Sequence, residues 1–167
     1  MRRVLLAIAA AASLAACSPK ADPGALAASA AEAKAFMDKN AGAEGVKTLP
    51  SGLQYKVVRS GPPGGMRPQE TDEVKVHYEG KFVDGKVFDS SYERGLPAAM
   101  PLKALIPAWV EALQLMRPGD EWMLYVPPEL GYGEQGAGGG EIPPNSVLIF
   151  RIELIDVLPG PGRVAQG

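Results

Sequence analysis

The chain has 167 residues, of which 46% are hydrophobic and 22% are charged, and its formal net charge is −2. This composition is typical of one soluble domain and excludes both disorder along the whole length and a multispan membrane protein. A single histidine and a single cysteine exclude an internal disulfide and argue against a zinc site or a Cys–His nucleophile pair. Because basic residues are not in excess, we expect no nucleic-acid partner.

Residues 1–16 are predicted to be a secretory signal peptide. Two arginines precede an apolar run over 4–16, which is too short to span a bilayer as a helix. The run ends in Leu14-Ala15-Ala16-Cys17, which resembles the bacterial lipoprotein signal, in which the cysteine becomes the lipidated first residue. We therefore predict lipidation of Cys17 and attachment to a membrane. The alternative is an ordinary leader that holds a cysteine by coincidence.

The next segment, 17–49, is predicted to contain the lipidated cysteine, a flexible tether over 18–24 and a helix over 25–40. The helix is rich in alanine, and four apolar residues near helical spacing mark its buried side: Leu26, Ala30, Ala33 and Met37. Alanine buries little area, so this helix should lie at the periphery of the molecule or pack on a second copy. Glycine and proline then break the chain over 42–50.

The rest of the chain reads mostly as strands. Apolar and polar side chains alternate in several segments, as they do in half-buried strands. These segments are 53–58, 74–79, 122–126 and 148–154. Residues 81–83 and 86–88 flank Asp84-Gly85, a dipeptide that suits a tight hairpin turn.

One clear helix is predicted within this domain, over 105–116. Trp109, Leu113 and Met116 share one of its faces, and Pro107 suits its first turn. A long loop over 127–146 is rich in glycine and proline. Several antiparallel strands and one helix predict an α+β domain, with the helix laid on one face of a curved sheet.

No standard nucleophile constellation is visible in the sequence, because no second histidine exists to complete a relay. We expect His77 to be a structural or solvated histidine on the strand face opposite Tyr78. The glycines of 131–140 do not form a phosphate loop, since the segment lacks Gly-Lys-Ser/Thr and leads to Pro143-Pro144 rather than to a helix. This stretch is either a surface loop or a flap over a site.

Two features place aromatic side chains near turns, and the first also places a carboxylate there. Phe88-Asp89-Ser90-Ser91 follows the predicted hairpin, and Tyr132 lies between two glycines. A tyrosine between glycines has little local packing, so its ring and hydroxyl could face a ligand. Each feature alone is weak evidence, because an aspartate followed by serines is usually a turn former.

Taken in order, several motifs resemble the FKBP-type peptidyl-prolyl cis-trans isomerases across residues 51–158. The matching runs are Val76-His77-Tyr78-Glu79-Gly80, Asp84-Gly85-Lys86-Val87-Phe88-Asp89-Ser90-Ser91, Val110-Glu111-Ala112-Leu113-Gln114-Leu115-Met116, Gly131-Tyr132-Gly133, Ile142-Pro143-Pro144-Asn145 and Leu148-Ile149-Phe150. Residues 44–55 resemble the entry to this domain in the macrophage-infectivity-potentiator branch, which Gram-negative bacteria export. The resemblance implies an isomerase domain over 50–158, with 159–167 as a flexible tail.

The resemblance also implies the fold and the site. The family fold is a strongly bent antiparallel β-sheet wrapped around one short α-helix, here preceded by the N-terminal Ala-rich helix. Implied catalytic residues are Asp89, Tyr132 and Trp109, and implied substrate-binding residues are Tyr78, Phe88, Met100, Leu105, Ile106, Ile142 and Phe150. Trp109 would form the floor under a proline ring. The Tyr132 hydroxyl and the Ile106 N–H would donate to substrate carbonyls, and Asp89 would act electrostatically or hold a neighbouring group. No cofactor and no metal are implied.

The function that the resemblance implies is rotation of X-Pro amides during the folding of exported proteins. The alternative is a membrane-tethered chaperone or binding module in which isomerisation is incidental or absent. Implied partners are proline-containing polypeptides, with macrolides as candidate inhibitors, and a membrane reached through the lipid on Cys17. The implied location is the periplasm of a Gram-negative bacterium, at the outer or inner membrane, as a monomer or a weak dimer through 25–40. Three places depart from the usual family pattern: Met100 stands where relatives usually carry Phe, Ala108 stands where they carry Gly, and the segment Gly138-Gly139-Gly140-Glu141 also differs.

Overall fold

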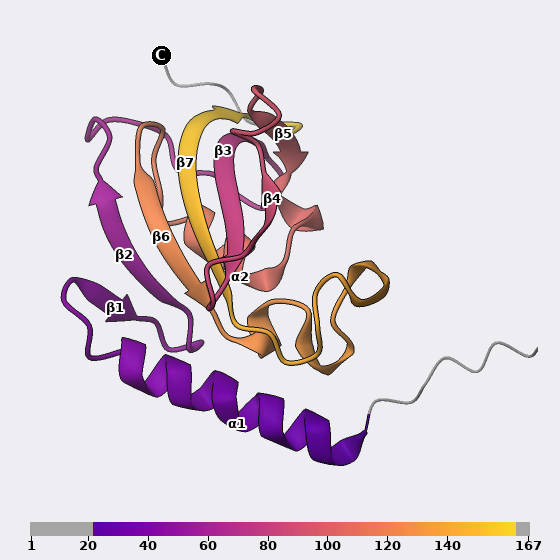
Figure 1. Ribbon diagram of the computed structural model, residues 1–167. Helices are drawn as coiled ribbons and strands as arrows, with labels where there is room; N and C mark the ends of the chain where they lie inside the picture. Colours follow the sequence, from indigo (N-terminus) through magenta and orange to yellow (C-terminus); the bar gives the residue numbers. More distant parts are fainter. Residues whose placement is uncertain (1–21, 163–167) are drawn as a thin grey trace, which may run out of the picture.

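The computed structural model describes residues 22–162, and these form two α-helices and a seven-stranded sheet (Figure 1). The helices are α1 (Pro23–Asn40) and α2 (Pro107–Leu113). The strands are β1 (Val46–Thr48), β2 (Gln54–Arg59), β3 (Glu73–Phe82), β4 (Val87–Ser90), β5 (Ala98–Pro101), β6 (Glu121–Val126) and β7 (Leu148–Leu158). The predicted fold class, α+β with a bent antiparallel sheet around one short helix, is confirmed.

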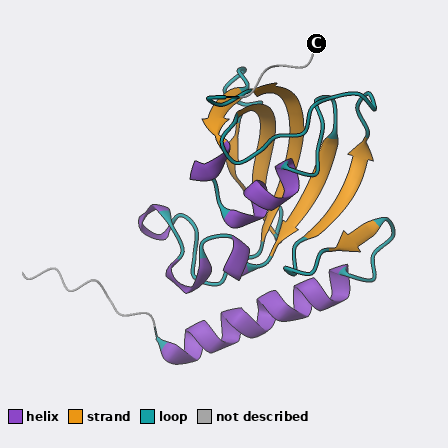
Figure 2. Ribbon diagram, turned by 180° about the vertical axis from the view of Figure 1, so that it is seen from behind, coloured by secondary structure: helices purple, strands orange, loops and turns teal. Residues whose placement is uncertain are grey.

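The strands follow the order β1-β2-β6-β7-β3-β4, and β5 pairs with the first half of β3 on the same edge as β4, opposite β7. Every pairing is antiparallel, and the longest ladder joins β3 to β7 from Glu73↔Leu158 to Phe82↔Leu148. The sheet curves around α2, which lies against its concave face (Figure 2). The main core lies between them, because the inward residues of β3, β6 and β7 and the buried face of α2 belong to one hydrophobic cluster.

Helix α2 is shorter than the predicted 105–116. It begins at Pro107 because proline fits the first helical position, and the preceding Ile106 is extended, as a residue before proline prefers. After Leu113 the chain tightens, since the N–H groups of Leu115 and Met116 donate to carbonyls three residues back. Met116 is nevertheless fully buried. The spacing of the apolar residues therefore identified the buried side chains correctly, but the helix is shorter than this spacing predicts.

Helix α1 crosses the lower end of the sheet, beside β1 and the loop that precedes β7 (Figure 1). Asp22 caps its first turn by accepting from the N–H of Gly24, and Pro23 follows at the first helical position. Its buried side is small, as the alanine content predicts: Ala33 and Met37 pack with Val147 in a cluster separate from the main core. The helix is therefore peripheral and packs on its own domain.

Three short segments differ from the predicted organisation. The stretch 42–50, where glycine and proline are expected to break the chain, contains β1, which pairs with β2. Strand β5 was not predicted at all. The start of the predicted flexible tail, 159–167, is attached to the domain, because the N–H of Gly160 donates to Asp72 Oδ1 at 2.9 Å. The predicted signal peptide and Cys17 lie outside the described residues.

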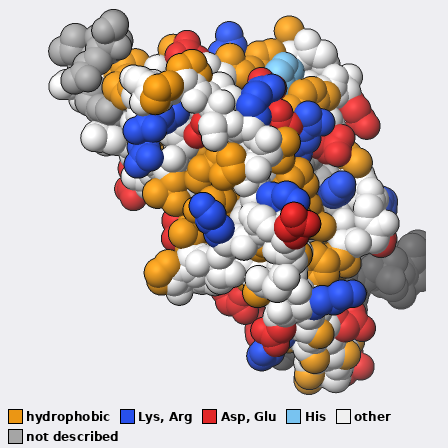
Figure 3. Space-filling view, turned by 90° about the vertical axis from the view of Figure 1, so that its left-hand side faces the viewer, with side chains coloured by type: hydrophobic (Ala, Val, Ile, Leu, Met, Phe, Trp, Pro, Cys, Tyr) orange, Lys and Arg blue, Asp and Glu red, His pale blue; other side chains and the backbone are white. Residues whose placement is uncertain are grey.

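The surface on the β1–β2 side of the molecule mixes acidic and basic side chains around a central area of hydrophobic ones (Figure 3). Neither sign of charge gathers into a broad field on this face. Exposed Val57 and Val58 of β2 contribute to the hydrophobic character of this sheet edge. Over residues 22–162, neither helix has the length and apolar content needed to cross a bilayer.

Candidate active site

A pocket of about 290 Å³ opens between α2 and the concave face of the sheet. Its walls come from β3, β4, β5, β7, α2 and the loop after β6, so the fold gathers residues that are far apart in the sequence. The lining residues are Tyr78, Phe88, Asp89, Met100, Ala104, Leu105, Ile106, Trp109, Tyr132 and Phe150. Eight of these ten residues are aromatic or have apolar side chains larger than that of alanine, which makes the pocket mostly apolar.

Trp109 lies at the centre of the aromatic group. Its ring meets Tyr78 edge to face at 5.1 Å and Phe150 edge to face at 5.2 Å between centroids. Phe88 continues the arrangement, since its ring lies 5.7 Å from that of Phe150, also edge to face. Aromatic rings prefer this geometry, and contacts on several sides fix the position of each ring. Only 5% of Trp109 is exposed, so its ring is part of the core as well as of the pocket.

Gly80 on β3 allows these rings to lie close to the sheet. A Cβ at this position would stand 2.7 Å from Phe88 Cζ and 2.8 Å from Phe150 Cε1. Such contacts are too short for carbon atoms, so any larger residue would displace the two rings. The absence of a side chain at Gly80 therefore shapes the aromatic wall from behind.

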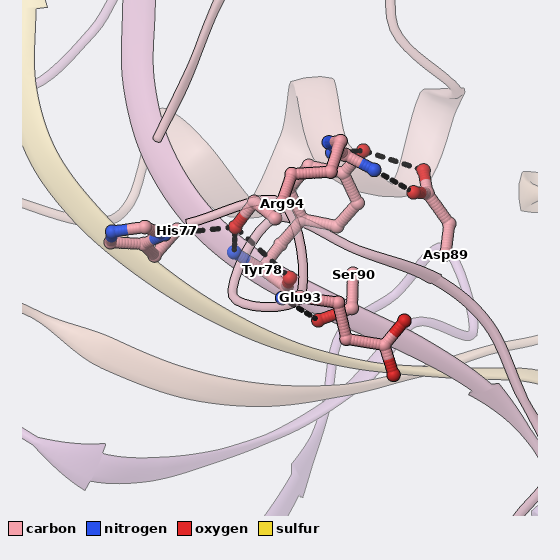
Figure 4. A network of polar contacts seen from close by, with 7 residues as sticks. His77, Tyr78, Asp89, Ser90, Glu93 and Arg94 are labelled. Carbon is pink, nitrogen blue, oxygen red and sulfur yellow. Dashed lines mark hydrogen bonds and ion pairs between the residues drawn. The ribbon is translucent and has the colours of Figure 1, made fainter. Parts of the chain in front are cut away.

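A polar network closes one side of the pocket (Figure 4). The Tyr78 hydroxyl donates to Asp89 Oδ2 at 2.5 Å, and Arg94 donates to Asp89 Oδ1 and, at 2.8 Å, to the Tyr78 hydroxyl oxygen. The Arg94 guanidinium also lies 5.4 Å from the centre of the Tyr78 ring, within reach of a cation–π interaction. Both carboxylate oxygens of Asp89 are therefore engaged by the protein itself.

This network shifts the ionisation of both acidic groups. Burial, followed by the hydrogen bond to Asp89, raises the pKa of the Tyr78 hydroxyl above its ordinary value. For Asp89, burial alone would raise the pKa, but the hydrogen bonds from Tyr78 and Arg94 outweigh it and hold the pKa below its ordinary value. Asp89 is consequently an ionised hydrogen-bond acceptor at neutral pH.

Two polar groups stand at the open rim of the pocket. Tyr132 precedes a short 3-10 turn in the loop after β6 and is 39% exposed. The N–H of Ile106, just before α2, donates to none of the residues that the structure describes. Beyond Tyr132 lies a second cavity of about 360 Å³, which Ile142 and Glu141 line together with Phe88 and Asp89.

The structure brings nearly all the residues implied by the family resemblance into one place. Nine of the ten line the pocket, Met100 among them, and Ile142 lines the adjoining cavity. Ala108, one of the three departures from the family pattern, is fully buried in α2. The sequence reasoning missed Arg94, whose signal was only an arginine five residues after Asp89 in an irregular loop.

His77 lies outside the pocket, on the opposite side of β3 from Tyr78. Its Nδ1 is 2.9 Å from the hydroxyl of Ser91, and its ring stacks on Tyr92 at 4.7 Å. The same Ser91 hydroxyl accepts from the N–H of Tyr78 at 2.8 Å. His77 thus supports the strand that carries Tyr78 and does not reach the pocket.

Comparison with protein families matches residues 64–155 to the family described as FKBP-type peptidyl-prolyl cis-trans isomerase. Residues 8–57 match the domain described as amino-terminal to FKBP-type peptidyl-prolyl isomerase. Together the two matches extend from the predicted leader to β7.

Similar proteins come from Gram-negative bacteria. The chain is 54% identical over 128 residues to peptidyl-prolyl cis-trans isomerase Mip of Coxiella burnetii, covering 77% of this chain and 54% of that protein. It is 50% identical over 129 residues to the FKBP-type 22 kDa peptidyl-prolyl cis-trans isomerase of Escherichia coli, covering 77% of this chain and 61% of the relative. The chain thus spans little more than half the length of these relatives.

Solved structures show the same arrangement. FkpA from Escherichia coli superimposes with a TM-score of 0.76 at 44% identity, covering 83% of this chain and 63% of that one. A peptidyl-prolyl cis-trans isomerase from Pseudomonas syringae superimposes with a TM-score of 0.75 at 34% identity, covering 84% of this chain and 100% of the other.

Proposed function

The chain belongs to the FKBP-type peptidyl-prolyl cis-trans isomerase family, and we propose that it accelerates the rotation of X-Pro amides in the pocket between α2 and the sheet. The observation that carries this proposal is the pocket itself, an aromatic cavity built around Trp109 with the Tyr132 hydroxyl and the Ile106 N–H at its rim. Its size, about 290 Å³, suits a proline ring and its neighbouring atoms.

The physics of amide rotation explains why such a pocket is sufficient. Resonance gives the X-Pro amide a rotation barrier of about 18–20 kcal/mol, so uncatalysed exchange takes about 10–100 s. A twisted amide has lost this resonance and is less polar than a planar one. A water-poor aromatic cavity therefore binds the twisted form better, and binding the transition state more tightly than the ground state lowers the barrier.

Each residue then has a distinct role. Trp109 forms the floor under the proline ring, with Tyr78, Phe88 and Phe150 as walls. Tyr132 and the Ile106 N–H donate to substrate carbonyls and so hold the peptide on both sides of the bond that rotates.

Asp89 acts through its neighbours. Its two oxygens accept hydrogen bonds from Tyr78 and Arg94, and these bonds orient the Tyr78 ring in the pocket wall. Of the two roles that the sequence left open for Asp89, this geometry favours the one in which it holds a neighbouring group. Its lowered pKa also makes it a poor general base.

A cis-to-trans isomerisation assay on Leu-Pro and Phe-Pro peptides tests the proposal. Tyr132→Phe removes only a hydroxyl and should slow catalysis, whereas Tyr92→Phe is a matched control outside the pocket. The two tyrosines are 39% and 37% exposed, so the substitutions are comparable in burial. Added rapamycin should compete with the peptide for the pocket. A purified protein that leaves the uncatalysed rate unchanged would remove the enzyme hypothesis and leave the tethered binding module.

We also propose that the protein is a lipoprotein of the Gram-negative cell envelope, anchored through Cys17 to the outer or inner membrane and acting on exported proteins in the periplasm. The signal-like run before Cys17 and the Gram-negative origin of the relatives support this. Labelling cells with radioactive palmitate should mark the wild-type protein but not Cys17→Ser. An unlabelled wild-type protein would contradict the anchor.

We further propose that the protein is a monomer or a weak dimer through residues 25–40. The buried side of α1 is occupied by its own domain, which leaves only the exposed, alanine-rich side for a second copy. Light scattering of the purified protein over a range of concentrations should show a monomer that dimerises weakly. A tight dimer at the lowest concentration would contradict this.

A further inference from the structure

Asn145 occupies an unusual place between α1 and the loop that carries Tyr132. It ends the Ile142-Pro143-Pro144-Asn145 motif and is only 7% exposed. Its backbone has φ = 56°, and it is the only residue other than glycine with a positive φ in the described chain, 22–162. Asparagine tolerates this left-handed conformation better than most residues, so both its backbone and its side chain suit the position.

The side chain of Asn145 binds α1. Its Nδ2 donates to the carbonyl oxygen of Leu26 at 3.0 Å and to Ser29 Oγ at 3.2 Å. Ser29 Oγ in turn donates to the same Leu26 carbonyl at 3.0 Å. The buried carboxamide of Asn145 therefore holds the first half of α1 through hydrogen bonds.

The backbone of Asn145 binds the loop on the other side. Its N–H donates to the carbonyl oxygen of Gly133 at 2.9 Å, directly after Tyr132 in the chain. The carbonyl of Tyr132 accepts from the N–H of Gly136 at 3.1 Å, and an antiparallel bridge joins Ala137 to Ile142. A single residue thus connects α1 to the turn that presents Tyr132 to the pocket.

Helix α1 is also held near its other end, so its position is well defined. Gln54 on β2 donates from Nε2 to the carbonyl of Met37 at 2.8 Å and accepts from Asn40 at 2.8 Å. Between the two ends, Ala33 and Met37 pack with Val147. A helix fixed at both ends provides a firm support for Asn145.

We propose that Asn145 is a positioning residue through which the docking of α1 sets the position of Tyr132 and thereby the activity of the pocket. Tyr132 has glycine on both sides and a half-exposed ring, so little packing of its own defines where its hydroxyl lies. The turn that carries Tyr132 must be placed by its hydrogen bonds, and the Asn145–Gly133 bond joins this turn to the residue whose side chain binds α1. The proposal rests on the isomerase function proposed above.

Three variants of the full-length protein test it. Ala33→Glu places a charge in the small cluster under α1 and should undock the helix from far outside the pocket. Asn145→Gly removes the carboxamide while keeping a residue that tolerates positive φ. Ala35→Glu is the matched control, since it makes the same change at an exposed position of the same helix.

Ala33→Glu and Asn145→Gly should each lower kcat/KM by roughly three- to tenfold, as expected for one lost hydrogen-bonded connection. Ala35→Glu should leave it unchanged. In a Tyr132→Phe background, Ala33→Glu should have little further effect, because residues that act through one group are not additive. An equal loss in that background would show a general structural effect and overturn the proposal, as would no loss in the single variants.

An NMR measurement separates this proposal from the isomerase function. The amide resonances of Tyr132 and Gly133 should shift in Ala33→Glu and remain in place in Ala35→Glu. If the wild-type protein proves to catalyse nothing while these resonances shift, the proposed function fails and the coupling between α1 and the loop stands. Unshifted resonances in Ala33→Glu would refute the coupling whatever the activity.

Discussion

Gly80→Ala should impair catalysis by disturbing the aromatic wall from behind. The new methyl group would lie 2.7 Å from Phe88 Cζ and 2.8 Å from Phe150 Cε1. Ordinary carbon contacts are about 3.5–4.0 Å, so the two rings must move by about 1 Å. Both rings line the pocket, and their displacement changes the cavity that receives the proline.

The expected effects follow from two magnitudes. Overpacking a well-filled core costs about 1–3 kcal/mol, which lowers Tm by about 4 °C for each kcal/mol in a domain of this size. A displacement of about 1 Å in a site that depends on positioning can cost up to about a hundredfold, so we expect kcat/KM to fall at least about tenfold. Activity should therefore fall much more than the folded fraction at 25 °C.

Thermal unfolding and the peptide isomerisation assay, made on the same preparation, check both effects. Gly64→Ala is the control, because a Cβ there meets nothing within 4 Å and the residue is exposed. A folded Gly80→Ala protein with wild-type kcat/KM would show that the position of the aromatic wall does not contribute to catalysis.

Three further predictions concern the polar network of the pocket, the docking of α1 and a buried carboxylate just before β6. Arg94→Ala removes a hydrogen bond that holds the pKa of Asp89 down, so the pKa of this carboxyl in the folded protein should rise. The stability that the ionised carboxylate contributes is present above its unfolded pKa and is lost as pH falls through its folded pKa. Acid unfolding of the variant should therefore begin at a higher pH than that of the wild type. An unchanged acid transition would show that Arg94 does not hold Asp89. Met37→Ala should lower the free energy of unfolding by about 2 kcal/mol and speed hydrogen exchange in α1, whereas unchanged exchange would mean that Met37 does not dock the helix. Asp120→Ala should lower the free energy of unfolding, measured in urea, by about 2–3 kcal/mol, because this buried carboxylate accepts hydrogen bonds from the N–H groups of Gly61 and Arg117. An unchanged free energy of unfolding would show that these two hydrogen bonds do not stabilise the fold.

The strands and their inward faces could be predicted from the sequence because a sheet that is buried on one face requires apolar and polar side chains to alternate along each strand. Val74, Val76 and Tyr78 all face the core, as their spacing indicated. Strand β5 could not be predicted in this way, since Ala98-Ala99-Met100-Pro101 contains no β-branched residue and ends in proline. It is a strand because β3 offers it a free edge, which is a tertiary cause.

The pocket aromatics could be placed through the family motifs, whereas the polar network could be predicted only in part. Asp89 was identified, but its partner Arg94 lies in an irregular loop, and no local pattern states that the loop folds back over Tyr78. The same is true of Asn145, whose contacts with Leu26 and Ser29 join residues more than one hundred positions apart. Long-range hydrogen bonds of single side chains leave no periodic signal in the sequence.

We propose that the pocket around Trp109 accelerates X-Pro rotation by favouring the twisted amide. The most direct measurement is the cis-to-trans rate of a Leu-Pro peptide with wild-type protein and with Trp109→Leu, both shown to be folded. We predict a clear acceleration by wild type and a large loss of kcat/KM in the variant. Equal rates for the two folded proteins would show that the pocket around Trp109 does not accelerate the rotation.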